Sequence, residues 1–535
     1  MTFRQLEIYF HTLRYMKMKQ IAYRAWYMLR NRVRIKTGFR YSISMDSLRH
    51  ELMLIPSIPA PVSFRWDGTE SRFSFLNLSH TFADRIDWNY SDQGKLWTYN
   101  LNYFDYLMQP DMTREQGIGL IRAYIADIRL AKDGLEPFPI ALRGINWIKF
   151  LSRHEVRDKT IDDALLAQYY ILLDNLEYHL LGNHLLENGF SLLFGAFYFG
   201  DEKLFLKAKE ILEEELAEQI LPDGAHFELT PMYHQIMLFR VLDCCNLMQH
   251  NRVFEDLRLQ DLLKEKASVM LGWLEHITFR DGTIPHLNDS AEGIAPTTSA
   301  LQEYAGNLGI ETLHRPLQEC GYRRFSGERY EMIVDVGNIG PDYIPGHAHS
   351  DTFNFVLSVD EKPLIVDTGI STYENNARRH YERSTAAHNT VEVNGVDQSE
   401  AWSSFRVARR AKITEIVETD ASVRATHDGY RHIGVLHTRQ FESFDSKIEI
   451  KDFVSSQGAA VCEAVAFLHF APGVEPRLEN GGKILTDQAI FSFEGLKSVE
   501  IVDITIAEGY NRLVESKAAK LFFQKELLTR IEIVS

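Results

Sequence analysis

The 535-residue sequence has few of the residues that stabilise small secreted domains, with only four cysteines. They are Cys244, Cys245, Cys320 and Cys462, and no two of them have the C-x-x-C spacing of redox or zinc motifs. We therefore expect reduced core residues without a redox role. A chain of this length can bury a large core without disulfides, so two large domains are the natural expectation.

Long hydrophobic runs are also missing. The longest nearly unbroken apolar run, residues 190–199, is far shorter than the roughly 20 residues that cross a bilayer. Near the N-terminus, cations such as Arg14, Lys17 and Arg24 interrupt every apolar stretch, which is unlike the continuous core of a signal peptide. The sequence therefore predicts neither a membrane-spanning helix nor export by the ordinary route. It favours a location in the cytoplasm or at the periphery of a membrane.

Basic residues are unevenly distributed along the chain. Residues 1–40 contain ten Lys or Arg and one acid, Glu7, although the whole chain has a formal net charge of −16. Because apolar residues alternate with these cations, one interpretation is an amphipathic helix lying on anionic lipid. The alternative is a solvated helix packed on the next domain. We expect no nucleic-acid partner, and the sequence does not indicate an oligomeric state.

Hydrophobic periodicity divides the rest of the chain into two parts. Between about residues 110 and 280 it predicts helices, including segments 117–130, 163–176, 205–221, 235–249 and 257–276, which indicates an all-α layer or ring. After about residue 320 it predicts short strands, including 332–336, 353–359, 390–393, 448–454 and 499–506. Strands without intervening helices favour an antiparallel sandwich. The boundary is expected within residues 286–325.

The segment at residues 346–351, Gly-His-Ala-His-Ser-Asp, holds two histidines separated by one residue. On an extended chain His347 and His349 point to opposite faces, so one can bind a metal while the other faces a substrate. Asp367, which ends an apolar strand, and His388 would complete a His/Asp/His set with His349, suited to zinc. Solvated or hydrogen-bonded histidines are the alternative.

A polar cluster interrupts an otherwise apolar helical region at residues 182–189, Gly-Asn-His-Leu-Leu-Glu-Asn-Gly. His184 and Glu187 are three residues apart and share a helical face, next to Asn183. The cluster is either a site or a capping and loop element, because glycines flank it on both sides. A further element is residues 222–235, where Tyr233 opens a helix just after a proline. Packing is the alternative role for that tyrosine.

Together these elements resemble the heparinase II/III family of polysaccharide lyases and its alginate-lyase relatives. The resemblance covers most of residues 95–410 and is strongest over 346–410. There, H-A-H-S-D, I-V-D-T-G and the run over residues 378–400 look like the family's C-terminal signature. Residues 96–106 and 143–147 look like its helical segments, especially in members associated with surface-polysaccharide loci.

The resemblance implies an incomplete (α/α) toroid followed by an antiparallel β-sandwich. It also implies β-elimination on an acidic, uronic-acid-containing polysaccharide where the two halves meet. Asn183 and His184 match the positions that hydrogen-bond the substrate carboxylate, where negative charge develops. Glu187 would orient His184. Tyr233 matches the tyrosine that protonates the leaving oxygen, with His347 as base or charge neutraliser, or with the tyrosine itself as the base.

Further expectations follow from the same resemblance. Zinc is expected at His349, Asp367 and His388, in a structural role that holds the loops presenting His347. The expected organisation is a basic N-terminal helical or extension region over 1–90, the toroid over 91–320 and the sandwich over 321–535. The expected substrate contacts are Trp97, Asn100, Tyr103, Arg143, Asn146, Trp147 and Arg383.

The biological role is inferred from the predicted location and from the charge of the chain. Without a visible signal peptide, we expect a part in capsule or exopolysaccharide metabolism rather than nutrient scavenging. The acidic bulk of the chain argues against a highly sulfated substrate, because polyanion binding usually needs a basic patch. The alternatives are a non-catalytic polysaccharide-binding or assembly factor with the same fold, and a uronate epimerase.

Overall fold

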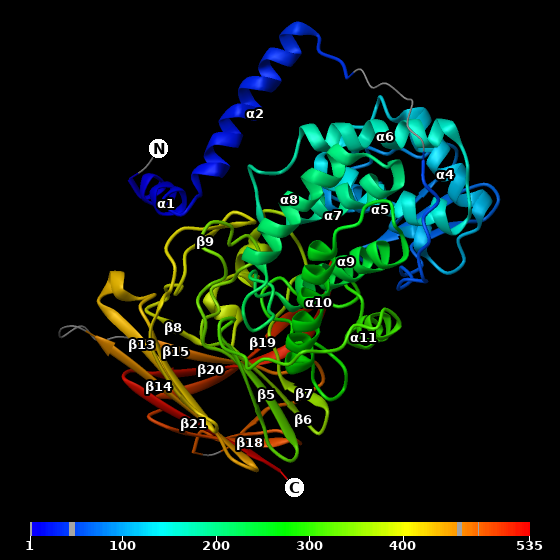
Figure 1. The fold of residues 1–535 in the computed structure, drawn as a ribbon. Coiled ribbons are helices and arrows are strands. Elements are labelled where there is room, and N and C mark those ends of the chain that lie inside the picture. The colour runs from blue at the N-terminus through cyan, green and yellow to red at the C-terminus, as the bar shows by residue number, and fades with distance from the viewer. Residues whose placement is uncertain (1–2, 42–48, 457–462, 480, 535) are drawn as a thin grey trace.

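The computed structural model of the chain describes residues 3–41, 49–456, 463–479 and 481–534. Helices dominate the first half and strands the second (Figure 1). The helices are α1 (Phe3–Leu13), α2 (Met18–Thr37), α3 (Lys95–Tyr103), α4 (Arg114–Asp127), α5 (Pro137–Arg153), α6 (Lys159–Asp174), α7 (Gly182–Phe199), α8 (Glu202–Gln219), α9 (Pro231–His250), α10 (Leu257–Ile277), α11 (Thr298–Asn307) and α12 (Ala377–Glu382).

Within the described residues the strands lie in five sheets, and every pairing between these strands is antiparallel. They are β1 (Phe64–Trp66), β2 (Ser71–Phe75), β3 (Leu78–Phe82), β4 (Tyr322–Ser326), β5 (Tyr330–Asp335), β6 (Phe355–Val359), β7 (Lys362–Ile365), β8 (Val391–Val393), β9 (Ala401–Trp402), β10 (Arg406–Val407), β11 (Ile413–Thr419), β12 (Ser422–His427), β13 (Val435–Ser443), β14 (Lys447–Ser456), β15 (Ala464–His469), β16 (Arg477–Leu478), β17 (Ile484–Leu485), β18 (Ala489–Glu494), β19 (Ser498–Gly509), β20 (Arg512–Phe523) and β21 (Glu526–Ile533).

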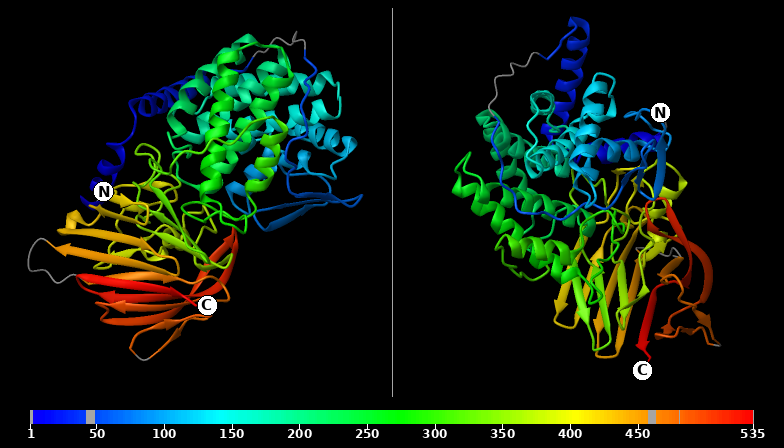
Figure 2. Two further views of the ribbon diagram at one scale, coloured as in Figure 1. Left: turned by 60° about the horizontal axis from the view of Figure 1, so that its bottom comes forward. Right: turned by 90° about the vertical axis from the view of Figure 1, so that its right-hand side faces the viewer.

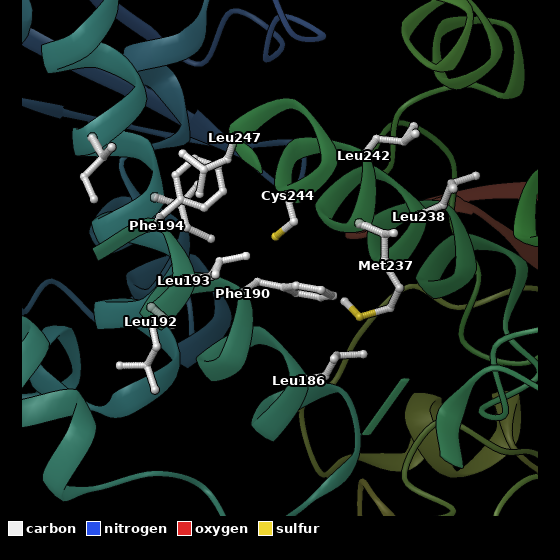
Figure 3. Packing of buried hydrophobic residues seen from close by; sticks show 14 of the residues in the cluster. Leu186, Phe190, Leu192, Leu193, Phe194, Met237, Leu238, Leu242, Cys244 and Leu247 are labelled. Carbon is white, nitrogen blue, oxygen red and sulfur yellow. The ribbon is translucent and has the colours of Figure 1, made fainter. Parts of the chain in front are cut away.

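The helical part is built around α7, which is buried on nearly all sides. Such a helix needs neighbours all round, and α5, α8 and α9 pack against it. Figure 3 shows the core between α7 and α9, where Phe190 and Leu193 lie near Cys244. As expected, Cys244, Cys245 and Cys320 are free and buried, whereas Cys462 lies outside the described residues. The five predicted helices correspond to α4, α6, α8, α9 and α10.

The strand-rich part forms three large sheets below the helices (Figure 2). Their strand orders are β4-β5-β6-β7, β19-β20-β15-β8 and β11-β12-β13-β14-β21-β18-β17-β16. Along β13 and β14 buried side chains alternate with more exposed ones, as expected for a sheet with one face on the core. The structure confirms the predicted fold class, a helical toroid followed by an antiparallel β-sandwich.

A small sheet, β1-β2-β3, lies within residues 1–90, the region predicted as a basic helical or extension region. Its strands are only three to five residues long, so their alternating pattern gives a weak signal in the sequence. Phe75 of β2 packs edge-on against Trp97 of α3, with ring centroids 5.2 Å apart. The sheet therefore belongs to the toroid core. Among the described residues, no helix has the length and apolar character needed to span a membrane.

One carboxyl in the toroid core gives a prediction about stability. Glu215 of α8 is 1% exposed and accepts a hydrogen bond from Gln219 at 2.6 Å. Burial raises the pKa of Glu215 to about 7. The folded state therefore binds the Glu215 carboxyl proton more tightly than the unfolded chain does. The protonated side chain contributes fully to stability below the unfolded pKa of about 4.3. That contribution is lost as the pH rises through the folded pKa.

We expect Glu215→Gln to raise the free energy of unfolding at about pH 8 by roughly 1–3 kcal/mol and to change it little at about pH 4. Chemical denaturation at both pH values measures the difference. Glu202→Gln, at an exposed position in the first turn of the same helix, is the control. Equal pH dependence in Glu215→Gln and in the parent would contradict this assignment of the buried proton.

Candidate active site

Polar side chains from both halves of the molecule meet where the helices face the sheets. Asn183 lies in the first turn of α7, Tyr233 lies in the first turn of α9, and His347 lies in the loop between β5 and β6. Asn183 Nδ2 is 3.5 Å from His347 Nε2, and the rings of Tyr233 and His347 have centroids 4.1 Å apart. The structure thus brings together three residues that are far apart in the sequence.

Strained backbone surrounds this meeting point. Leu181 has φ 64° and ψ −155°, a region that is normally adopted by glycine, and it leads directly into α7 and Asn183. Leu229 and Asn288 also have positive φ, at 55° each, and Asn288 precedes Asp289. Each such residue costs about 1–3 kcal/mol, and strain of this kind clusters at functional sites. Surrounding packing therefore fixes the segments that present the polar side chains.

A buried carboxylate, Asp289, anchors His347. Its oxygens accept hydrogen bonds from His347 Nδ1 at 2.9 Å, His349 Nε2 at 2.8 Å and Arg379 Nη2 at 2.8 Å. Burial favours the neutral acid, but the Arg379 guanidinium and the hydrogen bonds from His347 and His349 together outweigh it and hold the pKa of Asp289 well below its usual range. With Nδ1 anchored, His347 presents Nε2 toward Asn183, which is the geometry of a general base.

Tyr233 is paired with a second tyrosine that sequence reasoning missed. The hydroxyls of Tyr233 and Tyr373 are 3.1 Å apart, and Tyr373 OH is 3.4 Å from His347 Nδ1. Burial raises the pKa of Tyr233 well above its ordinary value, so the phenol holds its proton. Tyr373 follows the I-V-D-T-G segment, but nothing in its local pattern marks it as a site residue.

His184 is held by a different carboxylate from the predicted one. Its Nδ1 is 3.0 Å from Glu177 Oε1, and Asn188 donates to the other oxygen of Glu177 at 3.0 Å. Burial opposes protonation of His184, but Glu177, with the nearby Glu228 and Glu187, outweighs it, and the pKa of His184 is raised. The predicted contact between His184 and Glu187 does not form, because Glu187 turns to Arg240, with an Oε1–Nε distance of 3.3 Å.

Five of the predicted substrate contacts are buried and cannot touch a substrate in this structure. Trp97 and Trp147 are fully buried in the toroid core. Arg143 is also fully buried and donates to the backbone carbonyls of Asn102 and Gly134. These predictions are corrected because side-chain type alone does not show whether an aromatic ring or a guanidinium faces solvent.

The other two of the five are Asn146 and Arg383. Asn146 is 2% exposed and donates to the Tyr103 carbonyl, and Arg383 is 1% exposed and donates to the Ala348 carbonyl. Asn100 is partly exposed on α3, while Tyr103 is mostly buried. Asn100 and Tyr103 remain predictions.

The predicted zinc trio lies directly behind His347. His349 and His388 are fully buried, and their ring centroids are 5.3 Å apart. Nδ1 of His349 and Nε2 of His388 have no hydrogen-bond partner. Each ring is anchored through its other nitrogen, His349 by Asp289 and His388 by Asp367 at 2.7 Å. This anchoring is typical of metal-binding histidines. However, no group of three His, Cys, Asp or Glu side chains in the described parts of the chain has metal-binding geometry.

Comparisons with known proteins agree with this architecture. The model of the heparinase II/III N-terminus matches residues 155–307, and the heparinase II/III-like C-terminal model matches residues 311–531. A heparin-sulfate lyase of Bacteroides stercoris is 26% identical over 259 residues, which cover 42% of this chain. The match spans only 38% of that relative's length.

Solved structures show the same fold at low sequence identity. A structure of heparinase III has a TM-score of 0.63 and 16% identity, over 84% of this chain and 79% of that one. The heparan sulfate lyase HepC of Pedobacter heparinus has a TM-score of 0.55 and 15% identity, over 87% and 81%. Since the two family models together match most of the residues, the chain belongs to the heparinase II/III family.

Proposed function

We propose that the chain is a polysaccharide lyase that cleaves a uronic-acid-containing polysaccharide by β-elimination. The observation that carries the proposal is the convergence of Asn183, Tyr233 and His347 on one point, with His347 anchored by Asp289. A pure binding site needs donors for a carboxylate, but it does not need a buried phenol beside an anchored imidazole. That combination supports proton transfer.

The chemistry follows from the charges that develop. Removing the C5 proton of a uronate places a second negative charge next to its carboxylate, so preorganised donors lower the barrier. We assign this task to the Asn183 amide and to His184, whose raised pKa favours the cation. His347 Nε2 takes the C5 proton. Tyr233 gives its proton to the leaving glycosidic oxygen, while the C4–O bond breaks and a C4–C5 double bond forms.

Product analysis on a panel of uronic-acid polysaccharides, including the native surface polysaccharide, tests the proposal. We expect ultraviolet absorbance from a conjugated double bond and shortened chains carrying an unsaturated end. Binding without absorbance across the panel would support the non-catalytic binding factor. Inversion at C5 without cleavage would support the epimerase.

We further propose a substrate with few sulfates, in capsule or exopolysaccharide metabolism. Arg143 and Arg383 bind backbone carbonyls, and Arg379 binds Asp289, so these guanidiniums are occupied within the protein. The carboxyl groups of Glu228 and Glu177 lie beside Asn183 and His184 and disfavour dense negative charge nearby. We expect faster cleavage of unsulfated polymers than of heparin in the same panel.

Zinc is proposed as a structural ion. The unpaired nitrogens of His349 and His388 would hold it, tying the loop that presents His347 to the segment before β8. Asp367, the third predicted ligand, bonds His388 Nδ1 on the other side of that ring and would orient it instead. Zinc would supply a rigid tie between these segments, with no part in the proton transfers. We expect about one zinc per chain in the purified protein, and none in His388→Ala.

The same variant is expected to lower Tm by roughly 5–10 °C. Elemental analysis and thermal melting measure the two effects. His437→Ala is the matched control, because His437 is equally buried but pairs with Asp452 inside the sandwich. A metal-free parent, or full zinc content in His388→Ala, contradicts the assignment.

A further inference from the structure

The two N-terminal helices, α1 and α2, form an arm over residues 3–41. In this arm α2 lies on the outside of the toroid (Figure 1). The side of α2 that faces the protein is largely polar. It donates hydrogen bonds to residues 174–180, which comprise the last residue of α6 and the loop that precedes α7. The donors are Gln20, Arg24, Tyr27, Arg30 and Arg34. The arm is therefore attached mainly by polar contacts, together with the Tyr23 ring, which stacks on Tyr178 with centroids 4.6 Å apart.

The opposite side of α2 is apolar and faces solvent. Met18 is 76% exposed and Ile35 is 82% exposed, and five further large apolar side chains on this helix are at least 40% exposed, namely Ile21, Trp26, Met28, Leu29 and Val33. In α1, Leu6, Phe10 and Leu13 continue the pattern at i, i+4 and i+7. Helices of globular proteins normally bury such a stripe. An exposed apolar surface of this extent marks an interaction site.

Cations lie within the same exposed surface. Arg32 and Lys36 are exposed on the apolar side of α2, and Arg40 follows the helix. Over residues 1–40, ten Lys or Arg stand against one acid. An exposed apolar stripe with a tryptophan and interspersed cations matches the requirements of an interfacial helix on an anionic bilayer.

We infer that the arm docks the protein on an anionic phospholipid membrane. Charge complementarity favours this occupant over a second copy of the chain, because the exposed Arg32, Lys36 and Arg40 would repel their counterparts on a second arm. It is also favoured over a hydrated acidic polysaccharide, because leucine, isoleucine and methionine side chains gain free energy from lipid contact and not from a polar polymer.

The arm contacts both sides of the candidate active site. On the toroid side, the segment at residues 174–180 that α2 contacts contains Glu177, which forms a hydrogen bond with His184. On the sandwich side, Thr12 of α1 accepts a hydrogen bond from Trp402 at 3.1 Å, and the β9–β10 hairpin carries Phe405 next to His347, with ring centroids 6.1 Å apart. Membrane docking would therefore tether the candidate active site to the bilayer through these two segments. This last consequence rests on the proposed function, whereas docking itself does not.

Vesicle flotation of the full chain tests the inference, with phosphatidylcholine vesicles that contain or lack phosphatidylglycerol. We expect flotation with the anionic vesicles, weakened by added salt. The double variant Leu29→Glu, Val33→Glu should lower the apparent affinity by about tenfold or more. Arg32→Glu combined with Lys36→Glu should act in the same direction. Leu257→Glu is the matched control, because Leu257 of α10 is 75% exposed outside the arm.

Three results would overturn the inference. The first is equal flotation of the arm variants and the parent, with thermal melting showing that all are folded. The second is a parent that does not float but self-associates in sedimentation, with the self-association lost in the arm variants. The third is retention on an acidic polysaccharide that the arm variants abolish, without any vesicle binding. Cleavage of a soluble polymer by the arm variants reports separately on the proposed lyase activity.

Discussion

Tyr233→Phe is expected to lower the elimination rate by about 10²–10⁴-fold. The substitution removes only the hydroxyl that would protonate the leaving oxygen, and it keeps the ring beside His347. Because burial keeps the phenol protonated, the loss should be similar across the neutral pH range. Initial rates of double-bond formation measure the effect, and direct binding measurements should show substrate affinity nearly unchanged.

Two further tyrosine variants make this result specific. Tyr170→Phe removes a hydroxyl that bonds Asp201 at 2.6 Å on the toroid, so its rate should equal the parent's. Tyr373→Phe removes the hydroxyl that is hydrogen-bonded to that of Tyr233. We expect a smaller loss of rate, because Tyr373 would position Tyr233 and not transfer the proton itself. A fully active Tyr233→Phe together with an inactive Tyr373→Phe would assign the proton donor to Tyr373 instead.

The residues that the sequence placed at the site are those with distinctive local context. Asn183 and His184 interrupt an apolar helix, and His347 belongs to an H-A-H-S-D segment, so all three stand out without a structure. Trp97 and Trp147 stand out equally as residue types, yet both fill the toroid core. Local sequence thus indicates the chemistry of a side chain but not the direction in which it points.

Partners supplied by loops were harder to predict. Helical spacing suggested Glu187 for His184, but the carboxylate comes from Glu177 in the loop before α7. Asp289 lies in an irregular segment between α10 and α11, where neither periodicity nor a motif marks it. Its role depends on packing of the two halves against each other, which no local pattern encodes.

The second large expected effect concerns Asp289, which accepts hydrogen bonds from the proposed base, His347, and from the buried Arg379. Asp289→Ala should lower the free energy of unfolding by about 3–5 kcal/mol, since it leaves Arg379, which is fully buried, without its carboxylate. It should also lower the elimination rate by about 10²–10⁴-fold, because His347 loses the acceptor that fixes its tautomer. Denaturation and initial rates measure the two losses independently.

A double variant separates these two roles of Asp289. Asp289→Ala combined with Arg379→Met removes the buried cation along with its partner, so much of the stability should return. Activity should stay low, because His347 Nδ1 still lacks its acceptor. Recovered stability without recovered activity is what a residue that positions His347 predicts. If the stabilised double variant regained the parent's rate, Asp289 would be a structural partner of Arg379 alone, and His347 would not depend on it as the base.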